Sequence, residues 1–317
     1  MWQLIICGVL IYKFVRFLIS EEESGQELKF MVGSRLEKLY GGRVFYALRI
    51  PDEGSGTRQS IDIVLLTKRE LSVIAIRNFA GILDAASDGS WSLRNSKGQF
   101  EKIPNLVEET RIQAAILESY LERRGVILPA GYLSCKVILA NSDCRALPSV
   151  TLHQEVLSYD KWMQLKEESR GGFREWLRHM FSRVERDVSD KIDKKLRFIL
   201  STSPAWDRLE LKGSQQIYGE FLGFKGKKED VDALKVVKRS KVAKIVKYKP
   251  IMFDLLSGGS TVHLFCIPRD YRNEGTSEVE RTEVSVRAGT EVVFQPMDAK
   301  KAQQFKVKKI ACLSLSP

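Results

Sequence analysis

The sequence predicts an α/β domain with a mixed sheet, followed by a helical connector and a C-terminal all-β, barrel-like domain. Residues 24–160 alternate between helical and extended patterns in the order helix, strand, strand, strand, helix, strand. Residues 161–204 carry a charged helical pattern, and residues 205–317 hold short, regularly spaced strands bounded by Gly, Pro and Asn. A chain of 317 residues is also long for a single core, so we expect more than one domain.

The first twenty residues, MWQLIICGVLIYKFVRFLIS, predict a membrane-associated N-terminus. The segment is apolar from Leu4 to Tyr12 and is then interrupted by Lys13 and Arg16. A full membrane span needs roughly 20 apolar residues, and a secretory signal carries its charges before the apolar run rather than after it. Three possibilities stay open, namely a short anchor with snorkelling basic side chains, an interfacial helix, and a buried or disordered terminus.

Charge and cysteine content indicate the cellular compartment of the protein and the kind of partner it binds. The two basic residues after the apolar run favour a cytosolic body held by a single N-terminal anchor. Five scattered cysteines without a CxxC pair argue against both a disulfide framework and a structural zinc site. The formal net charge of +11 favours nucleic acid or an anionic membrane surface as a partner. No feature of the sequence identifies a protein partner.

The first domain begins with an amphipathic helix over residues 25–42. Apolar residues recur there at three- and four-residue spacing, as in Leu28, Val32, Leu36 and Leu39, and two glycines end it. A turn rich in Gly and Ser over residues 52–60 separates the first two strands. The elements expected after the helix are strands at 44–51, 61–66 and 71–77, one or two short strands around Trp91, a helix at 105–125 and a strand at 133–141.

In the rest of the chain the spacing of apolar residues is first typical of a helix and then typical of short strands. Residues 161–204 present an apolar face with Trp162, Trp176 and Phe181, which is typical of a packing or connecting helix. The strands expected beyond it are the segments QQIYGEFLGFKG, VAKIVKY, TVHLFCIP, TEVSVRAGTEVVFQP and FKVKKIACLSL.

The segment IDIVLLTKRELSVIAIRNFAG, residues 61–81, has the layout of a metal-dependent nuclease site. Such a site places two carboxylates on adjacent strands to hold Mg²⁺, with a lysine close to the reacting phosphate. A Glu-x-Lys on the second strand meets this need because residues two apart in a strand point to the same face. Here Asp62 opens the first strand and Arg77 ends the second, but Ala75 stands where the second acid is expected.

Residues 25–141 resemble the nuclease-related domain (NERD) family, a branch of the restriction-endonuclease-like fold. The family's second-strand motif is V-I-E-x-K-N-x-x-G, and the whole layout resembles plant members of the family. The resemblance implies a Mg²⁺-dependent nuclease site to which Glu27, Asp62 and residue 77 contribute. The matching segments are GQE with Glu27, QSID with Asp62, VIAIRNFAG with Arg77, Asn78 and Gly81, the later Trp91, and PNLVEETRIQAA at a helix start.

The departures from the family pattern predict a degenerate site. Ala75 replaces the Glu and has no oxygen for a metal, and Arg77 replaces the Lys with a cation that cannot give up a proton. We therefore expect a binding or scaffold module that needs no cofactor. The alternative is a Mg²⁺-dependent phosphodiesterase whose metal is held by Asp62 and a migrated carboxylate, Glu108. Glu108 and Glu109 also suit the first turn of a helix, near its positive end.

A run of lysines in the C-terminal part is the candidate surface for anions. The segment GFKGKKEDVDALKVVKRSKVAKIVKYKP spans residues 223–250. It predicts contacts with phosphates of nucleic acid or with an anionic membrane surface, and the alternative is a solvated charged face. The candidate binding residues are Lys238, Arg239, Lys241, Lys244 and Lys247.

Overall fold

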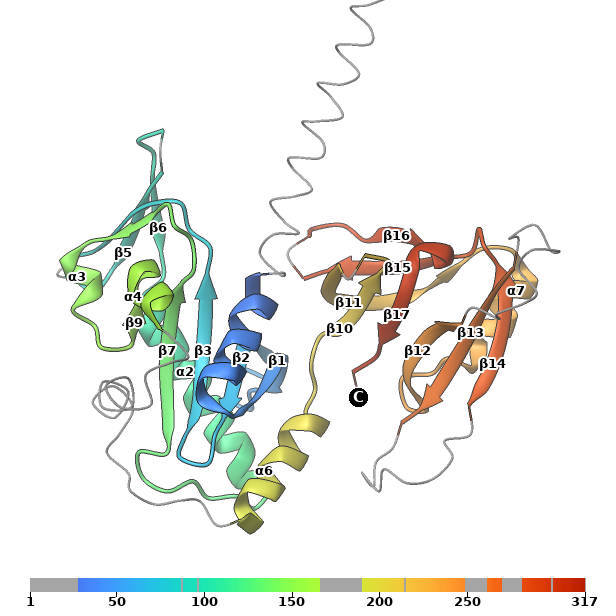
Figure 1. Cartoon of the computed structure of the whole chain (residues 1–317), viewed down its shortest axis with the longest axis horizontal. Coiled ribbons are helices and arrows are strands. Elements are labelled where there is room, and N and C mark those ends of the chain that lie inside the picture. Colours follow the sequence, from blue (N-terminus) through green and yellow to red (C-terminus); the bar gives the residue numbers. More distant parts are fainter. Residues whose placement is uncertain are drawn as a thin grey trace, which may run out of the picture. The chain divides into compact units, whose positions relative to one another are not determined.

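The computed structural model shows a chain that divides into two compact units (Figure 1). The first unit comprises Leu28–Ser203 and the second comprises Pro204–Pro317. The N-terminal segment 1–20 and Glu27, for which we predicted an anchor and a site residue, lie outside the described residues. The structure describes residues 28–86, 88–95, 97–165, 190–213, 215–248, 261–269, 281–297 and 299–316.

A five-stranded mixed sheet forms the centre of the first unit, which confirms the predicted α/β class. Its strand order is β1-β2-β3-β7-β9. The first three strands pair antiparallel, whereas β3, β7 and β9 run parallel. The strands are β1 (Arg43–Pro51), β2 (Arg58–Leu66), β3 (Leu71–Arg77), β7 (Leu133–Leu139) and β9 (Val156–Leu157).

Helices cover both faces of this sheet. The helix over residues 28–40 buries Val32 and Leu36 against Ile63 and Ile74 on one face. There it is joined by α4 (Tyr159–Gln164), whose Trp162 belongs to the same cluster. The helix α2 (Leu106–Arg123) packs on the opposite face. The side chains on the two faces of the sheet therefore belong to two separate apolar clusters.

The described part of the predicted connector packs as part of the first unit. The sequence pattern of residues 161–204 is typical of a packing or connecting helix. The helix α6 (Asp190–Thr202) buries Leu196, Ile199 and Leu200, and Lys195 Nζ donates a 2.7 Å hydrogen bond to the carbonyl of Gly125. The reason is its amphipathic pattern, which places one apolar stripe against the unit that precedes it.

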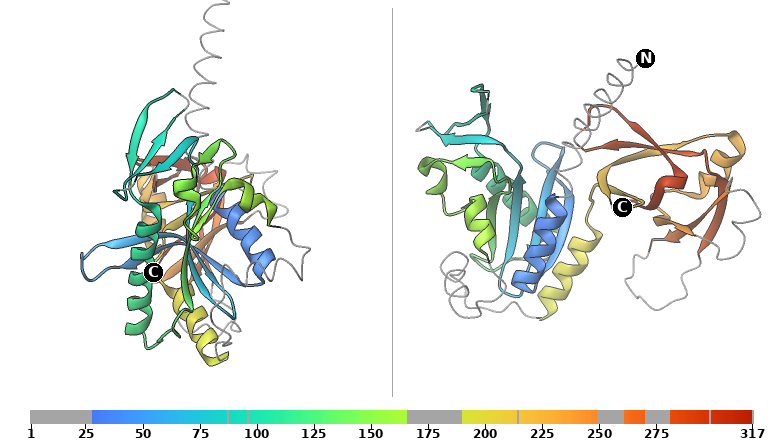
Figure 2. Two further views of the ribbon diagram at one scale, coloured as in Figure 1. Left: turned by 90° about the vertical axis from the view of Figure 1, so that its left-hand side faces the viewer. Right: turned by 45° about the horizontal axis from the view of Figure 1, so that its top comes forward.

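A second, smaller sheet extends the first unit beyond β3. Its strand order is β6-β5-β4-β8, and Figure 2 shows β5 and β6 projecting away from the five-stranded sheet. One face of this sheet packs Leu83, Trp91 and Ile103 against the start of α2. Its strands are β4 (Gly81–Ala85), β5 (Trp91–Arg94), β6 (Phe100–Ile103) and β8 (Cys144–Ala146), and the short helix α3 (Pro148–Thr151) follows.

Gly81, which opens β4, has a backbone that other residues cannot adopt without strain. Its φ is +126°, and a Cβ atom built on it would collide with the backbone carbonyl oxygen of Arg94 on β5. We expect Gly81→Ala to lower the free energy of unfolding of the first unit by roughly 1–3 kcal/mol, as measured by urea denaturation. Gly89→Ala is the control, because Gly89 also has a positive φ, of +79°, but no atom within 4 Å of its Cβ position. Equal losses in both variants would show that the contact with Arg94 does not matter.

The second unit is built on one antiparallel sheet, in agreement with the predicted all-β class. The strand order is β14-β13-β12-β17-β10-β11-β15-β16, so the last strand in sequence lies in the middle. Its apolar side chains form one cluster that includes Leu209, Val262, Phe294 and Leu313. The strands are β10 (Asp207–Leu211), β11 (Gln216–Lys225), β12 (Val242–Tyr248), β13 (Thr261–Pro268), β14 (Thr282–Arg287), β15 (Glu291–Pro296), β16 (Gln303–Lys306) and β17 (Ile310–Ser314).

Short helical segments complete the second unit. They are α7 (Lys228–Ala233), η1 (Leu234–Val236) and η2 (Val307–Lys309). Strand β10 was not among the predicted strands, because three of its five residues, DRLEL, are charged. Among the described residues of the whole chain, no helix combines the length and the apolar character needed to cross a membrane.

Candidate functional site

Asp62 lies where the β2–β3 ladder ends. The backbone pairs of these strands run from Leu66 with Leu71 to Ile63 with Ile74. One residue beyond this ladder, a side chain bonds to the backbone of β3. Asp62 Oδ2 accepts a 3.0 Å hydrogen bond from the backbone N–H of Ile76. The predicted neighbourhood of Asp62 and the end of β3 is therefore present.

Two cations neutralise this carboxylate. Lys29 Nζ, from the helix over residues 28–40, lies 2.8 Å from Asp62 Oδ1, and an Arg77 guanidinium nitrogen lies 3.0 Å from Asp62 Oδ2. The other terminal nitrogen of Arg77 contacts Glu109 Oε2 at 3.2 Å. We call Lys29, Asp62, Arg77 and Glu109 the Asp62 network. It contains two acids and two bases, so its charges balance.

The helix α2 supplies Glu109 and not Glu108 to the network. The side chain of Asn105 caps the helix by accepting from the backbone N–H groups of Val107 and Glu108, which fixes the first turn. Glu109 then reaches Arg77, whereas Glu108 is 59% exposed and pairs with Arg111. This differs from the prediction, which placed Glu108 at the site. Adjacent helical residues point about 100° apart, so a one-residue ambiguity in the sequence decides which acid faces the sheet.

Ala75 lies on the sheet face that α2 covers. It is 1% exposed and belongs to the apolar cluster that includes Leu106 and Val107 at the start of α2 and Val137 on the neighbouring strand. The position at which a second carboxylate would stand on β3 is thus filled by a methyl group among apolar neighbours. These apolar surroundings match alanine.

These residues do not fit a magnesium ion. Mg²⁺ needs near-octahedral oxygen coordination, usually with one or two carboxylates and several waters. Both oxygens of Asp62 contact cations, and the guanidinium of Arg77 lies between Asp62 and Glu109. Within the described part of the chain, no group of three or more His, Cys, Asp and Glu side chains is placed to hold a metal ion.

Comparison with known families agrees with the motif. Residues 24–140 match the family model of the nuclease-related domain (NERD). The first unit contains a nuclease-related domain. No curated protein and no solved structure matches the chain. The matched region includes Asp62, Arg77, Gly81 and the start of α2, so the Asp62 network lies within the nuclease-related domain.

A second buried polar cluster lies at the other end of β3 in the nuclease-related domain. Glu70, next to the strand, accepts a hydrogen bond from the Ser72 hydroxyl and a 3.3 Å hydrogen bond from Ser134 Oγ. Burial raises the pKa of Glu70 to about 7, although the hydrogen bond from Ser72 and the charge of Lys136 oppose this. Burial also lowers the pKa of Lys136. This cluster could not be recognised in the sequence, because Glu70 follows three polar residues, TKR, that predict an exposed turn.

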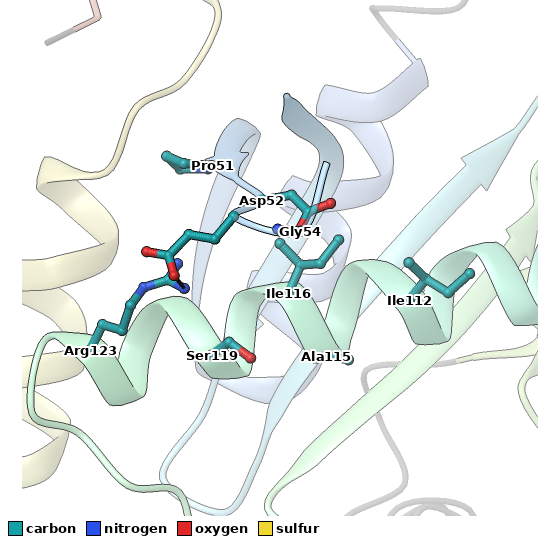
Figure 3. A pocket seen from close by; sticks show the side chains of 9 residues that line it. Pro51, Asp52, Gly54, Ile112, Ala115, Ile116, Ser119 and Arg123 are labelled. Atoms are coloured by element: carbon teal, nitrogen blue, oxygen red, sulfur yellow. Dashed lines mark hydrogen bonds and ion pairs between the residues drawn. The ribbon is translucent and has the colours of Figure 1, made fainter. Parts of the chain in front are cut away.

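A groove runs between the β1–β2 turn and α2 of the nuclease-related domain. Figure 3 shows Ile112 and Ile116 of α2 facing the turn, and the groove has a volume of about 340 Å³. At its edge, Arg123 pairs with Glu53 at 2.9 Å. The Asp52 carboxylate accepts hydrogen bonds from Gly54 N and Ser55 Oγ within its own turn. Glu53 therefore links the turn to α2, whereas Asp52 stabilises the turn itself.

The predicted basic residues of the second unit differ in their surroundings. Lys238 and Lys241 are exposed in the loop before β12, whereas Lys244 and Lys247 are half-buried on the strand itself. Lys247 Nζ donates to the carbonyl of Lys308 at 3.4 Å. Lys244 and Lys247 are three residues apart on β12, so they point to opposite faces of the sheet. Lysines that are close in the sequence therefore do not all share one surface.

Arg239, one of the residues predicted to contact anions, forms an ion pair within the second unit. Its guanidinium forms a bidentate pair with the buried carboxylate of Asp207, at 2.7 Å to Oδ1 and 2.6 Å to Oδ2, and also donates to the carbonyl of Phe221. The pairing explains why a residue inside a lysine run is an arginine, since only its planar fork matches a carboxylate with two hydrogen bonds.

Proposed function

We propose that this protein is a membrane-associated binding or scaffold module whose nuclease-related domain keeps a restriction-endonuclease-like fold without the metal-dependent reaction. The Asp62 network carries this proposal. The guanidinium of Arg77 contacts both Asp62 and Glu109. It thus provides, as a permanent part of the chain, the positive charge that a bound Mg²⁺ would provide. Lys29 adds a second cation on the remaining oxygen of Asp62. A divalent ion would have to displace at least one of them and would meet repulsion from the other.

The rest of the architecture fits the same proposal. Residues 1–20 would attach the chain to a membrane, with the body on the cytosolic side. Residues 161–204 would complete the first domain rather than only link two domains, and residues 205–317 would form a barrel-like second domain. Lys238, Lys241, Lys244 and Lys247 would contact phosphates of nucleic acid or of a membrane surface.

The alternative function is a Mg²⁺-dependent phosphodiesterase that uses Asp62 and Glu109. One observation favours it, namely that both carboxylates contact the same guanidinium and therefore lie at the same end of the sheet. If Arg77 turned outwards towards a substrate phosphate, the two acids would be left to share a cation. This alternative replaces the predicted pair of Asp62 and Glu108, because Glu108 points to Arg111.

Metal binding and cleavage separate the two functions. We would titrate the full-length protein with Mg²⁺ and Mn²⁺ by calorimetry, and assay labelled single- and double-stranded DNA and RNA for cleavage. We expect neither metal binding nor cleavage in the parent. A combined Ala75→Glu and Arg77→Lys variant should acquire metal binding, because it adds an oxygen ligand and removes the bridging guanidinium.

Two further variants make this experiment decisive. Ala75→Gln with Arg77→Lys has nearly the same size but lacks the charge, so it controls for the disturbance of a residue that is 1% exposed. Asp62→Ala removes the carboxylate common to both functions. Cleavage by the parent that is lost in Asp62→Ala would refute the proposal and establish the alternative.

A further inference from the structure

The small sheet of the first unit has a solvent face with an ordered row of side chains. Phe100 on β6 is paired with Arg94 on β5, Arg94 with Ile82 on β4, and Ile82 with Arg145 on β8. Residues opposite each other on neighbouring strands point to the same face, with Cβ atoms about 4.5–5.5 Å apart. One row across four strands therefore presents an aromatic ring, a cation, an aliphatic side chain and a second cation.

The aromatic ring of this row is strongly exposed. Phe100 is 73% exposed, and the guanidinium carbon of Arg94 lies 5.9 Å from the centroid of its ring. The next row on the same face adds Lys102, which is exposed, and Lys97 lies in the turn between β5 and β6. Burying such a ring against a base would remove apolar surface that the isolated unit leaves in water.

The cations of this face differ from those near the sites described above. Lys29, Arg77, Arg111 and Arg123 each contact a carboxylate. Within the described ranges, none of the cations of the solvent face has an ion-pair partner. These unpaired cations are Arg94, Lys97, Lys102 and Arg145.

The acids nearby neutralise the face only in part. Glu101 belongs to the other side of β6, because it is one residue away from Phe100 along the strand. Asp84 shares the face and keeps its charge, since the Ser149 hydroxyl that donates to it is neutral. Asp88 in the turn before β5 interacts electrostatically with Lys102. Four cations against these two acids leave an excess of positive charge around an exposed aromatic ring.

We propose that this solvent face binds single-stranded nucleic acid. A base would stack on Phe100, and Arg94, Lys102 and Arg145 would contact the backbone phosphates. Single strands fit better than duplexes, because a flat aromatic ring stacks on bases that are not already stacked. The proposal goes beyond the proposed function and does not depend on whether the Asp62 network is catalytic.

The small sheet is connected along the chain to the elements of the Asp62 network. The inner strand β4 begins four residues after Arg77, and the edge strand β6 ends just before Asn105, which caps the helix that carries Glu109.

Binding of oligonucleotides by the full-length protein tests this proposal. We would measure fluorescence anisotropy with labelled oligo(dT), oligo(U) and a duplex of equal length, over a series of salt concentrations. We expect tighter binding of the single strands. Phe100→Ala should weaken it roughly 5- to 100-fold, the loss expected for one base–aromatic stack. Arg94→Gln combined with Arg145→Gln should lower the slope of log affinity against log salt by about 1.4, since each phosphate contact contributes about 0.7.

Matched variants decide between this face and other surfaces. Leu152→Ala truncates another exposed apolar residue, which is 80% exposed, and should leave binding unchanged. Lys238→Gln combined with Lys241→Gln removes two exposed lysines of the second unit. The proposal is overturned if the parent fails to bind single strands, or if only the lysine variant loses affinity. It is also overturned if Phe100→Ala weakens binding to vesicles of phosphatidylserine and not to oligonucleotides.

Discussion

Asp207→Ala is expected to lower the free energy of unfolding of the second unit by roughly 3–4 kcal/mol. The Asp207 side chain is 1% exposed and accepts three hydrogen bonds, one from Arg239 and one each from the backbone N–H groups of Phe221 and Ser316. A second guanidinium nitrogen of Arg239 lies 2.6 Å from Asp207 Oδ2. The variant leaves the two backbone N–H groups without an acceptor. Because Arg239 is 40% exposed and can regain water, most of the loss comes from the backbone groups.

Urea denaturation with hydrogen exchange of β10 and β17 would measure this loss within the second unit. Asp232→Ala is the matched control, because Asp232 also pairs with a cation, Lys235, but both side chains are exposed. We expect the control to lose less than about 1 kcal/mol. Similar losses in both variants would mean that the buried carboxylate contributes no more than a surface acid does.

Glu70 is expected to make the first unit less stable as the pH rises. Its pKa in the folded protein is raised to about 7 from an ordinary value of 4.5, mainly by burial. Between these values the folded state holds a proton that the unfolded state has released, so the free energy of unfolding falls with pH. A difference of this size corresponds to about 3 kcal/mol, lost progressively between about pH 4.5 and pH 8.

Glu70→Gln tests this pH dependence because it keeps the shape of the protonated side chain. Relative to the parent, the variant should gain up to about 3 kcal/mol between pH 5 and pH 8 in urea denaturation. The nearby Lys136 also has a perturbed pKa, so the comparison is repeated in the Lys136→Met background. Glu122→Gln, an exposed position on α2, is the control. A stability difference that does not change with pH would contradict the expectation.

The helices and strands of the first unit could be predicted because the spacing of apolar residues differs between helices and strands. Strand β3 has the predicted bounds, 71–77, and α2 begins and ends within two residues of the predicted helix. The meeting of Asp62 with the end of β3 also follows from the sequence, since a short turn forces the two strands to pair. Gly81 could be recognised as part of the family motif. The close approach of the Arg94 carbonyl, which requires a glycine there, could not be predicted.

The partners of Asp62 could not be predicted in full. Lys29 lies on a helix that reaches the site only after it has packed across the sheet, and Glu109 differs from Glu108 only by the rotation of α2. Arg239 shows the same limit in the second unit. Its buried partner, Asp207, is more than thirty residues earlier, and the sequence does not distinguish a buried acid from an exposed one.

The solvent face of the small sheet, like the partners of Asp62, could not be predicted from the sequence. The four residues of its row come from four strands and are separated by loops of different length. Period-two alternation shows that Phe100 and Lys102 share a side, but it does not show which side is buried. Only the packing of Trp91 against α2 settles that Phe100 faces water.

The central position of β17 has a consequence for the order in which the second unit can assemble during synthesis. Residues 310–314 are made after all the other strands, yet they pair with β10 on one side and β12 on the other. Until they emerge from the ribosome, the sheet consists of two incomplete halves, β12 to β14 and the group of β10, β11, β15 and β16. Each half then presents an unpaired strand edge, which other chains can join. The nascent protein is therefore most exposed to misassembly just before its final strand closes the gap.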